Sequence, residues 1–224
     1  MDRGRSRPRQ TRSRDSLATL LPLLSVIVPM LNEGPSIQAT LAAIRAGAPD
    51  AEIIVVDGSS TDDSVAAARR SADKIISSPR GRARQMNAGG EIASAATLAF
   101  VHADTIVPRT FQDDILRALA DAAVVGGRFD VTLDDPSLAY RVIGDLISIR
   151  SRISRTATGD QAIFVRREVF GQLGGFPDLA LCEDLDFSRK LRRIGKVACL
   201  RSRVTTSARR WRKDGLMRTI LRMW

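Results

Sequence analysis

The strongest constraint on the fold is a set of short hydrophobic runs in which polar residues do not alternate. They are "LSVIVPM" (24–30), "EIIVVD" (52–57) and "TLAFVHA" (97–103). A strand that is apolar throughout is covered on both faces, which is typical of a parallel sheet between two layers of helices. The intervening segments place apolar residues at helical spacing, as in Ile37, Leu41 and Ile44. This alternation predicts an α/β fold with a mostly parallel central sheet and helices on both faces.

The charge of the chain is concentrated at its two ends. Of a formal net charge of +10, residues 1–16 contribute +4 (six arginines, two aspartates) and residues 201–224 contribute +7 (eight basic residues, one aspartate). The body is therefore nearly neutral, which argues against a basic groove, and we expect no nucleic-acid partner. We expect a basic arm over 1–23, one domain over 24–205 and a basic amphipathic segment over 206–224. The helical pattern still runs at Trp224, so a longer chain is expected.

Polar side chains follow three of the expected strands at the point where each strand ends. They are Asn32 and Glu33 after the first run, Asp57 and Ser59 after the second, and His102 and Asp104 after the third. The carboxyl ends of parallel strands meet at one edge of a sheet, and ligands bind there. A solvated turn is the ordinary explanation for any one of these residues. Three such turns together favour a binding site.

The first of these turns lacks the two common phosphate-binding patterns, G-x-G-x-x-G and G-x-x-x-x-G-K-[ST]. A nucleotide held there would be bound by side chains, with the charge of its diphosphate neutralised by a divalent ion. The carboxylate of Asp104 is a suitable ligand for Mg²⁺ or Mn²⁺, which commonly take one or two carboxylates and substrate phosphates. We therefore expect a metal at the rim where a diphosphate would lie.

Two of the expected helices begin with acidic residues. One has Asp62 and Asp63 in its first turn after Thr61 as the cap. The other, in "LCEDLDFSRKLRRIG" (181–195), begins with Glu183 and Asp184. Acids at a helix N-terminus complement the helix dipole, and a carboxylate placed as a general base is the alternative. No Ser/His/Asp or Cys/His set is present to supply a covalent nucleophile.

Five stretches in this order resemble family-2 glycosyltransferases of the GT-A fold. They are "SVIVPMLNE", "IIVVDGSSTDDS", "GRARQMNAGG", "FVHADT" and "FVRREVFGQLGGFPDLALCEDLDFSRKLRRIG", and the resemblance covers roughly residues 24–200. More narrowly, "HADT", "GDQAIF" and "TSARRW" resemble the bacterial branch labelled arsenosugar-biosynthesis or selenodomain-associated glycosyltransferases. The resemblance implies a hexosyltransferase-type enzyme that moves a sugar from a UDP- or GDP-sugar to an acceptor hydroxyl. Such enzymes usually invert the anomeric carbon and use Mn²⁺ or Mg²⁺.

The resemblance also implies a role for each residue that matches a family motif. The donor side is expected to comprise Pro29, Glu33, Asp57, Ser59, Arg82, Arg84, Asn87, His102 and Asp104. Asp104 matches the last carboxylate of the DxD motif and would ligate the metal. Asp184 matches the acid of the "ED" motif and would take the proton of the acceptor hydroxyl, with Glu183 beside it. Contacts on the acceptor side are expected at Gly159, Asp160, Gln161, Arg210 and Trp211.

Three departures from the family pattern limit what is carried over. Val56 replaces one aspartate of the usual DDGS, and His102 replaces the first aspartate of DxD. His102 could ligate the metal, bond a ribose or sugar hydroxyl, or orient Asp104. The QxxRW signature of processive members falls on "SARRW", which keeps Arg210 and Trp211 but not the glutamine. A polymerising synthase is therefore not expected.

The acceptor is expected to be a small molecule or a lipid-linked compound. The C-terminal segment, with Leu216 and Ile220 on one helical face, would lie on a membrane surface or pack on the core. We expect a cytoplasmic protein, peripheral at the inner face of the membrane. The alternatives are a nucleotidyltransferase of related fold, disfavoured because "PMLNEGPS" has no basic residue, and an inactive nucleotide-sugar-binding protein. The enzyme hypothesis predicts that Asp104 and Asp184 converge on one pocket.

Overall fold

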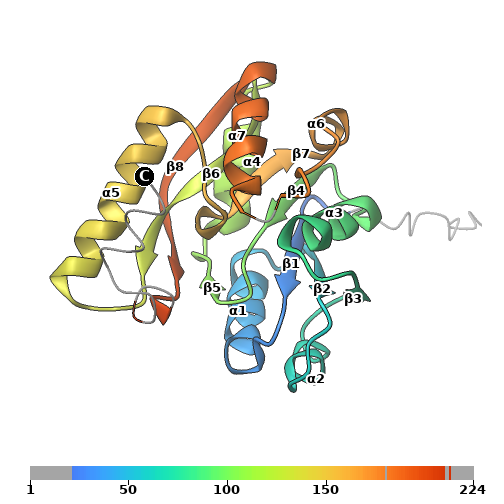
Figure 1. The fold of residues 1–224 in the computed structure, drawn as a ribbon. Coiled ribbons are helices and arrows are strands. Elements are labelled where there is room, and N and C mark those ends of the chain that lie inside the picture. The colour runs from blue at the N-terminus through green and yellow to red at the C-terminus, as the bar shows by residue number, and fades with distance from the viewer. Residues whose placement is uncertain (1–21, 180, 210–211, 213–224) are drawn as a thin grey trace, which may run out of the picture.

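The computed structural model describes residues 22–179, 181–209 and 212 (Figure 1). The strands are β1 (Ser25–Met30), β2 (Glu52–Asp57), β3 (Lys74–Ser77), β4 (Thr97–Phe100), β5 (Thr105–Ile106), β6 (Val124–Leu133), β7 (Ile163–Arg166) and β8 (Lys196–Thr206). The helices are α1 (Gly34–Gly47), α2 (Ser64–Ala68), α3 (Arg82–Ile92), α4 (Phe111–Leu119), α5 (Leu138–Ser154), the 3-10 turn η1 (Gly159–Gln161), α6 (Arg167–Gln172) and α7 (Glu183–Ile194). Within these residues the strands form one sheet in the order β3-β2-β1-β4-β7-β6-β8-β5.

The first half of the sheet is parallel, as the apolar runs predict. β1 pairs in parallel with β2 on one side and with β4 on the other, and β3 extends the same arrangement beyond β2. Every residue of β2 from Ile53 to Asp57 is buried, because helices cover both faces. The carboxyl ends of β1, β2 and β4 therefore meet at one edge, which is the edge that carries the predicted site.

The second half of the sheet is mixed. β7 runs antiparallel to both β4 and β6, while β6 and β8 are parallel along their length. We did not predict β8 from the sequence, because most of its residues are partly or fully exposed and Arg201 and Arg203 interrupt any apolar pattern. A strand with one poorly covered face does not present a continuous hydrophobic run.

Helices lie on both faces of the sheet (Figure 1), and two hydrophobic clusters pack them onto it. One cluster joins the inward residues of α1, α4 and α5 to one face, with Ile37, Phe111 and Ile147 among its members. The other cluster joins α3, α6 and α7 to the opposite face, with Met86 and Phe187 at its centre. Helices on both faces confirm the predicted α/β architecture.

Two local boundaries differ from the prediction. The helix expected to begin after Thr61 begins at Ser64, because the Asp62 carboxylate accepts hydrogen bonds from the backbone and hydroxyl groups of Ser64. The run 97–103 leaves the strand after Phe100, and a backbone bond from Thr105 to the carbonyl of His102 closes a turn. His102 and Asp104 thus lie in this turn rather than in a strand.

Candidate active site

The turns after β1 and β2 are bound to each other. The Asn32 backbone donates to the Ser60 hydroxyl at 2.9 Å, and the Asn32 side chain accepts from the Thr61 backbone at 2.8 Å. The Glu33 backbone donates to the Ser64 hydroxyl at 2.7 Å. These bonds hold the start of α1 beside the start of α2. They fix one wall of the predicted nucleotide pocket.

Three predicted donor residues lie along this wall. Asp57 is buried at the end of β2, and both of its carboxylate oxygens accept from the Ser60 backbone at 3.2 Å. Ser59 is exposed and has a positive φ of 73°, as the tight turn requires. Pro29 is half-buried in β1 opposite Val56 of β2. Their contacts with a nucleoside remain a prediction.

Arg82 and Arg84 of α3 face the segment that leads into α7. The guanidinium of Arg84 forms an exposed ion pair with Asp178 at 2.8 Å. The guanidinium of Arg82 lies 3.5 Å from the carboxylate of Glu183, whose side chain is almost fully buried. Of the predicted diphosphate-binding arginines, Arg82 therefore contacts the first turn of α7 and Arg84 the segment before it.

Asn87 also ties α3 to this segment. Its side-chain amide donates to the Phe176 carbonyl at 2.8 Å and accepts from the Phe176 backbone at 2.8 Å. The reciprocal pair makes Asn87 a structural link here, and its contact with a donor stays a prediction.

The only histidine of the chain is set against η1. His102 is 9% exposed, and its Nδ1 lies 3.1 Å from a carboxylate oxygen of Asp160. Its Nε2 is buried and has no hydrogen-bond partner among the described residues. A Cβ at Gly159 would lie 2.4 Å from this nitrogen, so only glycine permits the close approach of η1 to His102. Two of the three predicted acceptor-side residues of η1 thus lie beside the turn after β4.

The first turn of α7 also contacts the η1 loop. The two carboxylate oxygens of Asp184 accept from the backbone of Gly159 at 2.5 Å and of Leu185 at 2.7 Å. Burial raises the pKa of Asp184, and the negative charges of Glu183 and Asp160 raise it further, against the lowering effect of the backbone bonds. A carboxylate with a raised pKa is suited to accept a proton.

Asp104 lies in the same turn as His102, toward the predicted nucleotide pocket. Arg209, which follows β8, places its guanidinium 3.2 Å from the Asp104 carboxylate and 2.6 Å from that of Glu33. Bonding to Glu33 raises the pKa of Arg209, and Asp104 adds to this effect. Asp104 and Asp184 are thus connected through the same short turn, residues 102–104, and the η1 loop packed against it.

The carboxylates at this rim are compatible with a divalent ion shared with a substrate. Among the described residues, no three His, Cys, Asp or Glu side chains gather as a metal site. Mg²⁺ and Mn²⁺ do not require such a cluster when phosphate oxygens complete the coordination. Asp104 is partly exposed and is already paired with a cationic group, Arg209. A single protein carboxylate in this setting fits the expected metal.

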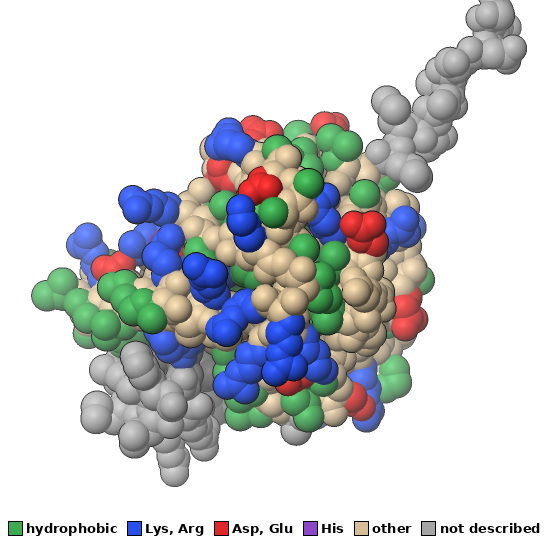
Figure 2. Space-filling view, turned by 90° about the horizontal axis from the view of Figure 1, so that it is seen from above, with side chains coloured by type: hydrophobic (Ala, Val, Ile, Leu, Met, Phe, Trp, Pro, Cys, Tyr) green, Lys and Arg blue, Asp and Glu red, His purple; other side chains and the backbone are tan. Residues whose placement is uncertain are grey.

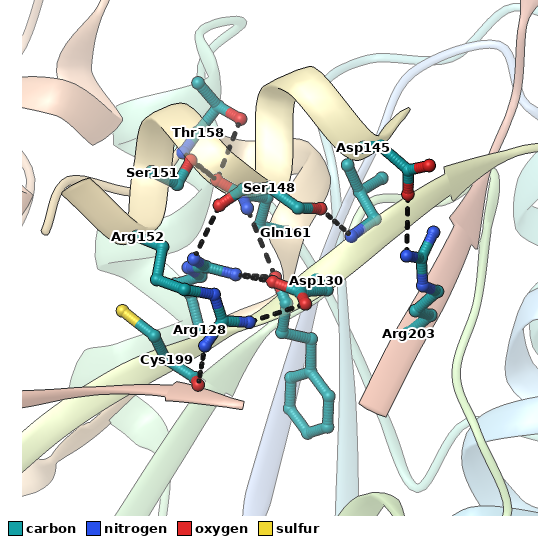
Figure 3. A network of polar contacts seen from close by, with 12 residues as sticks. Arg128, Asp130, Asp145, Ser148, Ser151, Arg152, Thr158, Gln161, Cys199 and Arg203 are labelled. Atoms are coloured by element: carbon teal, nitrogen blue, oxygen red, sulfur yellow. Dashed lines mark hydrogen bonds and ion pairs between the residues drawn. The ribbon is translucent and has the colours of Figure 1, made fainter. Parts of the chain in front are cut away.

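A buried network supports η1 from below (Figure 3). Gln161 is fully buried, accepts from the Ser151 hydroxyl at 2.6 Å and donates to the Phe129 carbonyl at 3.2 Å. Thr158 completes a capping box with it. Since no atom of the Gln161 side chain is exposed, its contacts here are with the protein, and it positions the loop that carries Gly159 and Asp160.

An ion cluster beneath this network was not predicted from the sequence. Arg128 of β6, only 1% exposed, pairs with Asp130, which also pairs with Arg152 of α5 at 2.6 Å (Figure 3). The guanidinium of Arg128 also donates to the Ser148 carbonyl at 3.1 Å. Buried charges must be paired and hydrogen-bonded to be tolerated. The cluster fixes α5 to β6 and thereby fixes the entry into η1.

Two further arginines were missed at the site. Arg209 is the first arginine of the "ARRW" run (208–211), but a basic tail gives no signal for which arginine reaches the carboxylates. Arg150 of α5 is half-buried; burial lowers its pKa, and the charge of Asp184 acts in the opposite direction. The neighbouring predicted residues Arg210 and Trp211, and most of the segment 206–224, lie outside the described residues.

Curated relatives share parts of this chain. Glycosyltransferase AglE of Haloferax volcanii is 27% identical over 177 residues, covering 72% of this chain and 58% of its own. A PGL/p-HBAD biosynthesis glycosyltransferase of Mycobacterium tuberculosis is 28% identical over 170 residues, covering 69% of this chain and 63% of its own. This chain therefore spans about three fifths of the length of these relatives.

Solved structures share the fold. The mannosyltransferase PcManGT of Pyrobaculum calidifontis, in complex with GDP-Man and Mn²⁺, superposes with a TM-score of 0.66 at 22% identity over 92% of this chain and 65% of its own. TarS 1-349 of S. aureus in complex with UDP-GlcNAc gives a TM-score of 0.66 at 19% identity, over 83% of this chain and 58% of its own. The fold is thus of the GT-A type. With residues 25–172 matching the model of the Glycosyl transferase family 2, the chain belongs to that family.

Proposed function

We propose that this protein transfers a sugar from a nucleotide-diphosphate donor to an acceptor hydroxyl, with inversion at the anomeric carbon. The observation that carries the proposal is the meeting of three elements at one rim. The turn 102–104, the η1 loop and the first turn of α7 contact one another through Asp160 and Gly159. Family membership and the GDP-Man and UDP-GlcNAc complexes of the structural neighbours support a nucleotide-sugar donor.

On the donor side, the walls formed by the turns after β1 and β2 would hold the nucleoside, with Glu33, Asp57 and Ser59 as contacts. Asp104 would hold a Mn²⁺ or Mg²⁺ ion. When bound, such an ion neutralises charge on the diphosphate leaving group. Arg209, which is paired with Asp104 in this structure, would compete with such an ion for that carboxylate.

On the acceptor side, Asp184 acts as the general base. The acceptor oxygen attacks the anomeric carbon, the bond from that carbon to the diphosphate oxygen breaks, and the hydroxyl proton passes to Asp184. The Gly159 backbone bond holds the receiving carboxylate at the edge of the η1 loop. Burial and the two neighbouring acids keep the proton affinity of this carboxylate above that of an ordinary aspartate.

The finer assignments belong to the same proposal. The motifs "HADT" and "GDQAIF" favour the arsenosugar-biosynthesis branch, and the acceptor would be a small molecule or a lipid-linked compound. A cytoplasmic location at the inner membrane face is the corresponding expectation. In the part of the chain that the structure describes, none of the helices has the length and hydrophobicity needed to cross a bilayer.

Two alternatives remain for the test. Membership of the Glycosyl transferase family 2 disfavours a nucleotidyltransferase. An inactive protein that binds nucleotide sugars would keep donor binding without transfer.

Thermal unfolding with a panel of sugar nucleotides tests the proposal directly. We expect a UDP- or GDP-sugar to raise the melting temperature only with Mn²⁺ or Mg²⁺ present, since Asp104 would hold the ion that neutralises the charge of the diphosphate. Asp104→Ala should remove this increase, while Asp113→Ala, which removes an exposed acid of helix α4, should keep it. Stabilisation by donor without metal, or unchanged stabilisation in Asp104→Ala, would contradict the proposal.

A further inference from the structure

One face of α5 is hydrophobic and exposed along its whole length. Its members, which we call the α5 apolar stripe, are Leu138, Val142, Leu146, Ile149 and Ile153, each at least 46% exposed and Ile153 81%. Their spacing places them on one side of the helix. The residues that pack α5 onto the sheet, including Ile143 and Ile147, lie on the opposite side. The stripe therefore does not contribute to the core of the described domain.

Basic residues accompany this stripe. The segment 138–155 contains four arginines and one aspartate, a net charge of +3. Arg141 and Arg155 are exposed, and Arg192 of α7 reaches the end of α5 by donating to the Ser154 carbonyl. The single acid, Asp145, is paired with Arg203 at 2.7 Å. Arg152 is paired with Asp130, and the acids before the helix, Asp134 and Asp135, are paired with Arg212. The exposed arginines beside the stripe are therefore Arg141, Arg155 and Arg192.

The position of α5 makes this face accessible to a large flat partner. α5 lies at the outer edge of the molecule, beside β6 and β8 (Figure 1). In Figure 2, hydrophobic side chains stand out at the left, on the side where α5 lies, with Lys and Arg side chains beside them. A helix of 17 residues is about 25 Å long, and its exposed stripe can lie flat on a plane along that length.

We propose that the α5 apolar stripe docks the protein on an anionic phospholipid bilayer, with the helix lying in the interface. An exposed hydrophobic face flanked by arginines is the arrangement that inserts between acyl chains while contacting acidic headgroups. A second copy of the chain is the less favoured occupant, because pairing two such faces would bring like charges together. The inference is independent of sugar transfer and of the basic ends of the chain.

If the proposed function holds, docking through α5 would also hold the end of α5, which leads into η1, at the membrane surface. α5 ends at Ser154, and η1, which carries Gly159 and Asp160, begins five residues later. This consequence rests on the proposed function, whereas the docking itself does not.

Co-sedimentation of the full chain with vesicles tests the docking. We expect binding to vesicles of phosphatidylcholine with phosphatidylglycerol and much weaker binding to phosphatidylcholine alone. The double variant Leu146→Glu/Ile149→Glu should bind the anionic vesicles at least about tenfold more weakly, because two inserted side chains become charged. Ile92→Glu, at an exposed isoleucine of α3 outside the stripe, is the matched control and should bind as the wild type does.

Several outcomes would overturn the proposal. The first is that the wild type does not bind the anionic vesicles. The second is that the double variant binds them as tightly as the wild type does, which would assign the binding to the basic ends of the chain. A wild-type dimer that the double variant converts to a monomer, measured by light scattering, would assign the stripe to a second copy. A large fall in melting temperature in the double variant but not in Ile92→Glu would show that the stripe is packed within the chain. The thermal shift with donor and metal should be unchanged in both variants, which separates this test from that of the proposed function.

Discussion

Glu52 and Asp184 are two shielded carboxylates at opposite edges of the same sheet, and their surroundings differ. Glu52 begins β2 at the amino edge, where Lys74 donates at 2.7 Å, Ser25 at 2.5 Å and the Ser94 backbone at 2.9 Å. Burial alone would raise the pKa of Glu52, but these bonds lower it to about 2. The carboxylate is satisfied as an anion, and it ties three strands and the loop before β4 together.

Asp184, at the carboxyl edge, has the opposite electrostatic setting. It accepts two backbone bonds and interacts with the charge of Arg150 of α5, but burial, together with the negative charges of Glu183 and Asp160, outweighs the backbone bonds. Its pKa is therefore raised rather than lowered. A carboxylate that the fold stabilises as an anion contributes to stability, whereas one that the fold leaves poorly neutralised is available to take a proton.

The largest expected effect is on transfer in Asp184→Asn. Removal of a general base should lower kcat by about two orders of magnitude or more, while the donor-induced thermal shift persists. At neutral pH its melting temperature should equal or exceed that of the wild type, because a poorly neutralised charge is removed. Asp186→Asn, which changes an acid of the same helical turn paired with Lys190 at 2.9 Å, is the control. Retained turnover in Asp184→Asn would move the base elsewhere, with Glu183 next.

Glu52→Gln should show the reverse pattern, a loss of stability with transfer retained per folded molecule. We expect a loss of about 1–2 kcal/mol, or roughly 3–8 °C in melting temperature, since charged hydrogen bonds at the carboxylate are weakened. The pKa of Glu52 is lower in the folded state, so its contribution is complete above about pH 4.5 and is lost as the pH falls to about 2. Thermal unfolding across this range measures it. If Glu52→Gln is as stable as the wild type at pH 7, the Glu52 carboxylate does not stabilise the fold and does not differ from Asp184 in this respect.

Glu183→Gln tests whether the charge of Glu183 contributes to the raised pKa of Asp184. The charge of Glu183 raises the pKa of Asp184, so its removal should lower that pKa. The base would then remain deprotonated at lower pH, and the acidic limb of the kcat/KM profile should move to lower pH. An unmoved acidic limb, measured with the same donor and metal, would argue that Asp184 does not control it.

The smallest effect is expected from Arg209→Ala. The guanidinium of Arg209 is paired with the carboxylates of Asp104 and Glu33. Because these ion pairs are half-exposed, Arg209 should compete only modestly with a metal for the Asp104 carboxylate. The Mn²⁺ concentration that gives half of the donor-induced thermal shift should fall about two- to fivefold. Arg117→Ala, which removes an exposed arginine paired with Asp114, is the control and should leave it unchanged. An increase in the required Mn²⁺ would mean that Arg209 assists metal binding.

The parts of the fold that could be predicted are those whose burial produces a local pattern. β1, β2 and α1 are covered by the core over most of their inward surface, so their hydrophobic residues follow the period of a strand or a helix. The acids at the start of α7 were also recognisable, because they follow a turn and precede a helical repeat. β8 was not, because its partly exposed face breaks the hydrophobic run.

In the candidate site, too, some features could be predicted from the local sequence and others could not. The sequence placed Asp104 and Asp184 at the ends of elements, but their relation depends on Gly159, which bonds one and packs against the histidine beside the other. Arg209 is one of eight basic residues in the last 24, and nothing local distinguishes it from its neighbours. Arg128 and Asp130 stand two residues apart in β6, but nothing in the sequence of that strand indicates that both are buried and paired.

The sequence alone determined the alternation of buried strands and helices, the edge at which polar turns meet, and the resemblance to a glycosyltransferase family. These follow from short-range periodicity and from residues that must stand at fixed places in an element. Only the tertiary structure decided which acid has a raised pKa, which arginine reaches Asp104 and which face of α5 stays uncovered. The reason is that a pKa, an ion pair and an exposed surface depend on groups brought together from distant parts of the chain.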